Sequence, residues 1–96
     1  MEILLTKSPR KDKKLMVIVD GKKIHFGASG YSDYTIHKDK ARMKRYEARH
    51  KKRENWGKSG IKTAGFWSKW VLWNKPSLSA SIKDLEKKFK IKVITV

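Results

Sequence analysis

Residues 15–26 read LMVIVDGKKIHF, and this stretch decides how the chain begins to fold. Its first five residues are apolar and rich in β-branched side chains, and a second run, ending in Ile, His and Phe, follows the pair Asp20-Gly21. An Asp-Gly pair between two such runs is the strongest short-range signal for a hairpin, because its type I′ turn needs positive φ at both central residues. The stretch therefore predicts two antiparallel strands joined by a tight turn.

The segments outside this hairpin predict two more strands and a loop. Residues 2–6 are predicted to form a short strand, and residues 7–14 (KSPRKDKK) a flexible basic loop. Residues 90–96 (KIKVITV) begin with Lys alternating with Ile or Val, which is the pattern of a half-buried strand. The turn-rich residues 27–34 close the β part of the chain.

A basic helix is predicted to follow the β part. Asp39 is placed to cap it, and we expect it to run to about Glu54. Its inward face is a narrow stripe at helical spacing, so we expect its other faces to meet solvent or a partner. The stripe consists of Met43, Tyr46, Glu47, His50 and Glu54.

Two further helices are predicted in the second half of the chain. Residues 66–73 (FWSKWVLW) form the densest apolar segment, in which Phe66, Trp70 and Trp73 share one helix face. Pro76 ends this helix, because the residue before a proline avoids helical dihedral angles. An amphipathic helix follows, with Ser77 or Ser79 as its cap. Its apolar positions are Leu78, Ile82, Leu85 and Phe89.

These elements together predict one α+β domain spanning residues 1–96. We expect a small antiparallel sheet, made of the N-terminal strand, the hairpin and the C-terminal strand, packed against two or three helices. With 39% hydrophobic residues and four tryptophans, the chain can bury one modest core. The residues expected to supply much of it are Leu15, Val17, Val19, Phe66, Trp70, Trp73, Ile82, Leu85 and Phe89, with Trp67 beside them.

Positive charge dominates the composition and is concentrated in one segment. The chain carries 25 Lys and Arg against 9 Asp and Glu, a formal net charge of +16, and residues 38–58 hold ten of the bases and three of the acids. Self-repulsion of this size favours an acidic partner, and a helix lined with bases can follow several phosphates of a duplex. The predicted nucleic-acid-binding residues are Lys44, Arg45, Arg49, Lys51, Lys52, Arg53 and Lys58, with Trp56 as a platform for stacking a base. The basic loop at residues 7–14 is expected to assist these phosphate contacts.

No set of residues indicates catalysis, metal binding or a cofactor. The three histidines are spread along the chain without the spacing of metal ligands. Glu47 and Glu54 would lie about 10 Å apart along a helix axis, and salt bridges to neighbouring Arg or Lys are the simpler interpretation of both. The GKSG sequence at residues 57–60 lacks the first glycine of a phosphate-binding loop. We therefore predict a protein that is not an enzyme and has no small-molecule substrate.

The chain also lacks the marks of secretion and of membrane insertion. It contains no cysteine, and no apolar stretch approaches the roughly 20 residues that span a bilayer. The apolar run at its start is too short for a signal peptide and is followed, not preceded, by positive charges. We expect a protein that is neither secreted nor embedded in a membrane.

One block is more specific than the rest: TAGFWSKWVLWNKP at residues 63–76. Together with residues 37–39, RYEARHKKRENW at residues 45–56, and residues 81–84, it resembles a family of small basic proteins of unknown function encoded by nucleocytoplasmic large DNA viruses, the giant viruses. The resemblance covers roughly residues 33–89. It implies a viral origin and a compact folded unit, and it carries over no binding or catalytic residue.

Two functions remain open at this point. The preferred hypothesis is sequence-independent nucleic-acid binding by a viral protein, with DNA favoured over RNA. The alternative is a minor capsid or virion-assembly protein that acts through contacts with capsid proteins. Both place the protein in the virion or in the interior of the infected cell.

Overall fold

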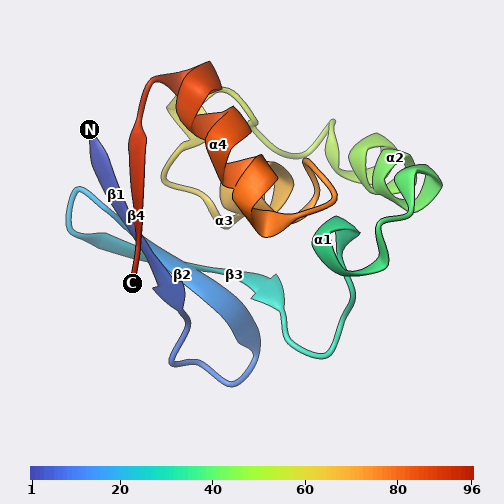
Figure 1. Ribbon diagram of the computed structural model, residues 1–96, viewed down its shortest axis with the longest axis horizontal. Helices are drawn as coiled ribbons and strands as arrows, with labels where there is room; N and C mark the ends of the chain where they lie inside the picture. Colours follow the sequence, from blue (N-terminus) through green and yellow to red (C-terminus); the bar gives the residue numbers. More distant parts are fainter.

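The computed structural model describes residues 1–96 and contains a four-stranded sheet in the order β3-β2-β1-β4 (Figure 1). The strands are β1 (Glu2–Lys7), β2 (Lys13–Val19), β3 (Lys22–Ala28) and β4 (Lys92–Thr95). The helices are α1 (Tyr34–His37), α2 (Lys40–His50), α3 (Ala64–Trp67) and α4 (Leu78–Phe89), with a 3-10 turn η1 (Lys58–Gly60) and a π-helical segment η2 (Ser68–Leu72). The predicted α+β class, with a small sheet packed against helices, is confirmed.

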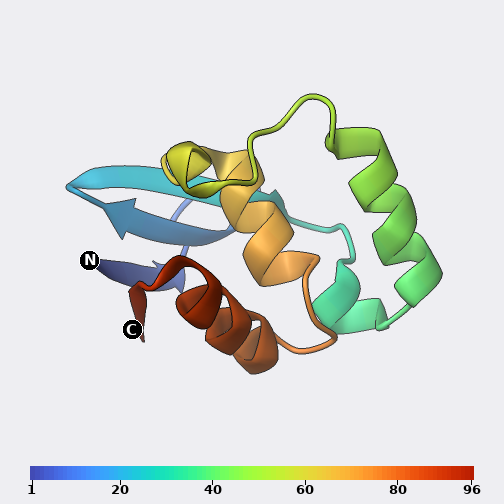
Figure 2. The ribbon, with the colours of Figure 1, turned by 90° about the horizontal axis from the view of Figure 1, so that it is seen from above.

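The helices cover one face of the sheet, and α2 stands apart from it. Segments α3, η2 and α4 lie over the sheet, whereas α1 and α2 lie beyond its end (Figure 2). On the covered face Ile3 and Leu5 of β1 are fully buried, as are Val17 and Val19 of β2. The sheet therefore alternates between a buried face and an open face, as the period of a strand requires.

The hairpin is as predicted. Asp20 and Gly21 have φ of 49° and 80°, the two positive values that a type I′ turn needs. Val19 pairs directly with Lys22 across the turn. The basic loop is shorter than predicted, because Lys7 ends β1 and Lys13 begins β2.

The sheet is mixed, whereas the sequence predicted an antiparallel one. β4 pairs with β1 in parallel, with Ile3 opposite Val93. The reason lies in the path of the chain: α4 ends beside the start of β1, where the Lys92 N–H donates to the carbonyl of Met1 at 3.0 Å. A strand entering there has to run in the same direction as β1.

Helix capping follows the sequence signals closely, although one boundary differs. Asp39 caps α2 as predicted, and Ser77 is the cap of α4. Helix α2 ends at His50 and not near Glu54, because the chain passes into turns over residues 51–53. The four-residue helix α1, capped by Asp33, was not predicted.

The tryptophan-rich helix differs from the prediction in its inward face. Within η2 the Trp73 N–H donates to the carbonyl of Ser68, five residues back, at 3.1 Å. A π-helical turn shifts the phase of the side chains that follow it. Trp67 and Val71 are completely buried, whereas Trp70, within η2, and Trp73, directly after it, are only partly buried and pack at the margin of the core.

The other predicted core residues are confirmed, some as buried residues and others as partly buried ones. Val17, Val19, Phe66 and Leu85 are buried members of one hydrophobic cluster. Leu15, Ile82 and Phe89 are partly buried and pack against it. The Trp67 Nε1–H, buried with its ring, donates to the carbonyl of Ile61 at 2.7 Å, so no polar atom of this side chain is left unpaired.

Helix α2 is attached to the body by two adjacent side chains. Tyr46 is its one buried residue, and its ring stacks on Trp73 with centroids 4.3 Å apart and planes 1° apart. Glu47 forms an ion pair with Lys69 at 2.7 Å. The Lys69 side chain is 7% exposed, and its Nζ lies 4.8 Å from the centre of the Trp70 ring.

Gly27 provides a test of how closely η2 packs on the sheet. It has φ of +79°, and a Cβ there would lie 2.7 Å from Leu72 Cδ1, whereas Gly30 has φ of +85° and open space around it. Gly30→Ala should cost about 1 kcal/mol for the left-handed backbone. Gly27→Ala should lower the free energy of unfolding by about 3 kcal/mol, because the clash of the new methyl group with Leu72 is added to the same backbone strain. Urea unfolding measures both free energies, and equal losses would contradict the packing described for Leu72.

The Glu47–Lys69 pair predicts an asymmetric response to substitution. Glu47→Ala should lower the free energy of unfolding by about 2 kcal/mol, because a buried ammonium loses its only carboxylate. Lys69→Met should cost less than about 1 kcal/mol, because Glu47 is 35% exposed and can be hydrated. Thermal or urea unfolding measures each variant, with Lys44→Ala as an exposed control on the same helix. A larger loss for Lys69→Met than for Glu47→Ala would refute this account.

Candidate nucleic-acid interface

The three acids of residues 38–58 are all directed away from the bases around them. Asp39 Oδ1 accepts from the backbone N–H groups of Ala41 and Arg42, at 3.0 and 3.3 Å. Glu47 reaches inward to Lys69. Glu54 pairs with His50, with 3.4 Å between Oε2 and Nδ1. The predicted salt bridge of Glu47 to a Lys or Arg is confirmed, with a lysine of η2 as the partner, whereas that of Glu54 is wrong, because its neighbour is a histidine.

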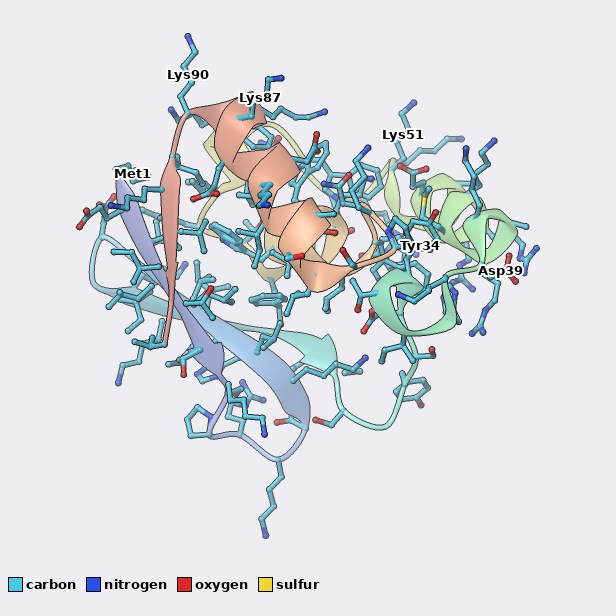
Figure 3. All side chains as sticks on the ribbon, viewed as in Figure 1. Met1, Tyr34, Asp39, Lys51, Lys87 and Lys90 are labelled. Carbon is cyan, nitrogen blue, oxygen red and sulfur yellow. The ribbon has the colours of Figure 1, made fainter.

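The bases of the same segment consequently have no carboxylate partner. The five ion pairs of the chain involve Arg10, Lys14, His50, Lys62 and Lys69, and none of the Lys or Arg side chains of residues 38–58. The side chains around α2 end in nitrogen atoms that point outward (Figure 3). The segment therefore presents its full cationic charge to solvent.

The predicted binding residues are all exposed except Trp56, and they surround α2 instead of forming one row. At 100° per residue, Arg45 points away from the inward side of α2 that Tyr46 and Glu47 define, and Lys52 lies in the turn after the helix. Arg49 lies on one flank of the helix, and Lys44 and Lys51 lie on the other. Arg53 follows α2 in a turn, where its guanidinium donates to the carbonyl of Arg49 at 3.4 Å. Lys58 lies further along, at the start of η1.

Trp56, the predicted stacking platform, is partly occupied by the protein itself. Its ring is half-buried and lies nearly parallel to Tyr46, with centroids 6.5 Å apart. Its carbonyl accepts from Trp70 Nε1 at 2.8 Å, and its own Nε1 is buried without a partner. Only part of this ring is open to a ligand.

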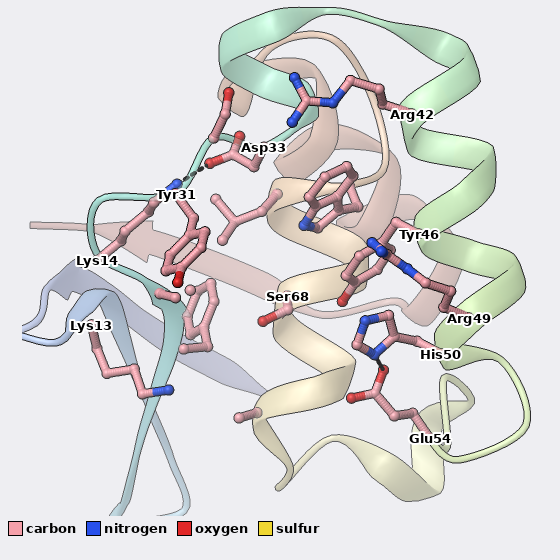
Figure 4. A pocket seen from close by; sticks show the side chains of 17 residues that line it. Lys13, Lys14, Tyr31, Asp33, Arg42, Tyr46, Arg49, His50, Glu54 and Ser68 are labelled. Carbon is pink, nitrogen blue, oxygen red and sulfur yellow. Dashed lines mark hydrogen bonds and ion pairs between the residues drawn. The ribbon is translucent and has the colours of Figure 1, made fainter.

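Two cavities flank α2, and the sequence indicated neither. The first, which we call the β3–α2 cavity, has a volume of about 420 Å³ and lies between α2 and the chain from the end of β3 to Asp33 (Figure 4). The second, the tryptophan groove, has a volume of about 700 Å³. The groove is lined mainly by Lys51, Trp56, Lys69, Trp70 and Lys88.

For the basic residues of these cavities outside α2, sequence reasoning gave the loop that ends in Lys13 and Lys14 only an assisting role, and it missed Lys88. Lys13 begins β2, and Lys88 lies near the end of α4, where its Nζ is 4.6 Å from the centre of the Trp70 ring. Both are far from residues 38–58 in the chain, so no local pattern links them to α2. Arg42 lies within the basic helix and lines the β3–α2 cavity. Its position one helical turn before Tyr46 was the signal in the sequence that could have placed it near the body of the protein.

The ionisation of Tyr46 is set by its position between α2 and the body. Burial, and then the negative charge of Glu54, raise the pKa of the Tyr46 phenol far above its usual value, while Arg49 lowers it by less. The phenol therefore stays protonated at physiological pH, and its O–H is available as a donor at the wall of the β3–α2 cavity.

Two further structural findings concern metals and membranes. No group of three or more His, Asp or Glu side chains lies close enough together to hold a metal ion. None of the helices combines the length and the apolar character that crossing a membrane requires.

Comparison with known proteins gives a family but no function. No curated protein and no solved structure matches the chain. Residues 3–50, from β1 to the end of α2, match a family of unknown function, DUF5754. The block at residues 63–76 lies outside this match, so the resemblance to giant-virus proteins stays a prediction. Because the match covers half of the chain, the protein belongs to the DUF5754 family of unknown function.

Proposed function

We propose that this protein binds the phosphate backbone of nucleic acid, without sequence preference and without catalysis, through the exposed bases of α2 and the turn after it. The observation that supports this most is the separation of charge within residues 38–58. The acids there serve the protein's own fold, and the bases have no carboxylate partner. A cationic surface left unpaired in this way is suited to neutralising phosphates.

The shape and composition of α2 favour phosphate contacts over the reading of bases. The helix is about 16 Å long, which spans several phosphates of a duplex. Its sequence, KARMKRYEARH, contains no Asn or Gln, the residues that recognise adenine in the major groove, and its three Arg side chains can bind phosphates as well as guanine. Contacts to phosphates position a protein on nucleic acid but carry no sequence information.

The biological setting of the proposal comes from the resemblance at residues 33–89. It supports a protein of a large DNA virus that acts in the virion or inside the infected cell. DNA is then the favoured partner, and RNA the less favoured one.

Affinity for duplex DNA should fall steeply with salt. Neutralising six phosphates gives a slope of about −5 for the logarithm of the affinity against the logarithm of the salt concentration. A gel-shift titration from about 0.1 M to about 0.5 M salt, with duplex DNA, single-stranded DNA and RNA in parallel, measures this slope. A slope near zero would show that phosphates are not the ligand.

Removing single bases from the outer face of α2 or from the turn after it should weaken binding equally on every sequence. Arg45→Ala and Lys52→Ala should each make the salt slope shallower by about 0.9, because each removes one phosphate contact. Lys87→Ala is the matched control, an exposed helical lysine on α4. Equal losses for all three variants would indicate that only net charge matters, and a loss on one sequence alone would indicate base recognition.

The open face of the sheet supports the second candidate, assembly with capsid proteins. Leu4 is 39% exposed and lies between Ile18 and Ile94, its partners on the two neighbouring strands. These three side chains form an apolar strip on the face opposite the helices. Stoichiometric association with a capsid protein that survives excess DNA and is lost in Leu4→Ser would favour this candidate.

A further inference from the structure

We propose that the β3–α2 cavity binds a nucleotide through its terminal phosphate monoester, either as a free nucleotide or at the end of a nucleic-acid strand. The cavity lies between α2 and the segment that joins β3 to α1, with Ser68 of η2 on its floor. Its volume of about 420 Å³ is within the range of small-ligand sites.

The charges around the cavity favour a dianion. Four bases line it, Lys13, Lys14, Arg42 and Arg49, against the two acids Asp33 and Glu54, and His50 is the other titratable base at its wall. A net charge of +2 matches a phosphate monoester, which carries close to two negative charges at neutral pH. A phosphodiester within a strand carries only one.

Asp33 is already engaged, Glu54 keeps a buried carboxylate oxygen without a hydrogen-bond partner, and three of the bases have no acidic partner. Asp33 is 3% exposed, pairs with Lys14 at 2.7 Å and accepts from the backbone N–H of Thr35 at 2.9 Å. Glu54 faces His50. Arg42, Arg49 and Lys13 have no acidic partner, and both guanidinium groups extend from α2 on the side of the cavity (Figure 4). Two guanidinium forks and an ammonium form a suitable set for phosphate oxygens.

Neutral donors complete the polar wall. The hydroxyl of Ser68 points into the cavity, and the protonated phenol of Tyr46 lies between Arg49 and His50 (Figure 4). Neither hydroxyl has a hydrogen-bond partner within the protein, so each can donate to a ligand oxygen.

Tyr31 is the feature that favours a nucleotide over a bare phosphate. Its side chain lines the cavity from the β3–α1 segment, yet the residue is 74% exposed and stacks on no other aromatic ring. An exposed aromatic ring beside a cluster of phosphate-binding side chains is placed to stack on a nucleobase. The sequence alone predicts no small-molecule substrate, and the proposal concerns a ligand that is bound and not converted.

This site is separable from the proposed backbone-binding surface. Lys13 and Tyr31 belong only to the cavity, and Arg45 and Lys52 belong only to the backbone-binding surface, whereas Arg42 and Arg49 are exposed bases of α2 that also line the cavity. Either proposal can therefore fail without the other.

Isothermal titration with adenosine 5′-monophosphate, inorganic phosphate and adenosine tests the cavity, at about 0.15 M salt to screen non-specific attraction. The monophosphate should bind most tightly, and adenosine most weakly. Arg42→Ala should weaken the monophosphate about tenfold or more, because a charge-assisted hydrogen bond is lost. Lys44 is a free base on the other flank of α2, and Lys44→Ala should change the affinity for the monophosphate less than about twofold.

Two further arms separate the stacking role and the source of the phosphate. Tyr31→Ala should lower the affinity for the monophosphate but not the affinity for inorganic phosphate. Tyr31→Phe should retain the affinity for the monophosphate. A 5′-phosphorylated single strand should bind better than its 5′-hydroxyl form if the ligand is a strand end, and equally well if it is a free nucleotide. The proposal is overturned if the monophosphate binds no better than adenosine, or if Arg42→Ala and Lys44→Ala have equal effects. If the protein binds the monophosphate but does not bind duplex DNA, only the proposed function is overturned.

Discussion

The stack of Tyr46 on Trp73 determines which way every charge of α2 points. Tyr46 is the one buried residue of this helix, and its ring lies parallel to Trp73 at 4.3 Å and close to His50 at the same centroid distance. A helix with so narrow an apolar stripe has few contacts to fix its rotation about its own axis. Once Tyr46 and its neighbour Glu47 both face inward, the geometry of 3.6 residues per turn places Arg45 outward and Arg49 on the flank. The orientation of both proposed binding surfaces follows from these two adjacent contacts.

The position of Trp73 depends in turn on the π-helical segment η2. A regular helix would keep Trp70 and Trp73 on the same face as Phe66, directed at the sheet. The wider turn, closed by the bond from the Trp73 N–H to the Ser68 carbonyl, moves both indoles to the margin of the core. Trp73 then meets α2, and Trp70 meets Lys69 and Lys88. The irregular turn therefore connects the hydrophobic core to the cationic helix.

Local signals predicted the parts of this fold that depend on local physics. The Asp20-Gly21 turn needs two positive φ values, Asp39 and Ser77 supply oxygen acceptors to free N–H groups, and these requirements are visible in a few residues. The parallel pairing of β4 depends on where α4 ends in space, which no short stretch encodes. The β3–α2 cavity joins Lys13 to Arg49 across the fold, so its lining could not be read from spacing along the chain. The partner of Glu47 is equally a tertiary property, whereas the His50–Glu54 contact is a local (i, i+4) pair.

The large positive charge of this protein comes from its composition, and several of its few acids bind groups of the protein other than the surface bases. Beyond Asp39, Glu47 and Glu54, Glu86 accepts from the Val93 N–H at 2.9 Å and Asp84 from Asn74 at 2.8 Å. Acids that satisfy the protein's own donors are poorly placed to neutralise the bases at its surface, and the repulsion among those bases opposes the compact state. A ligand that binds the folded state and not the unfolded one stabilises it by mass action. An anion that joins the bases of α2 would therefore relieve this repulsion, so binding and folding stability are coupled through the same charges.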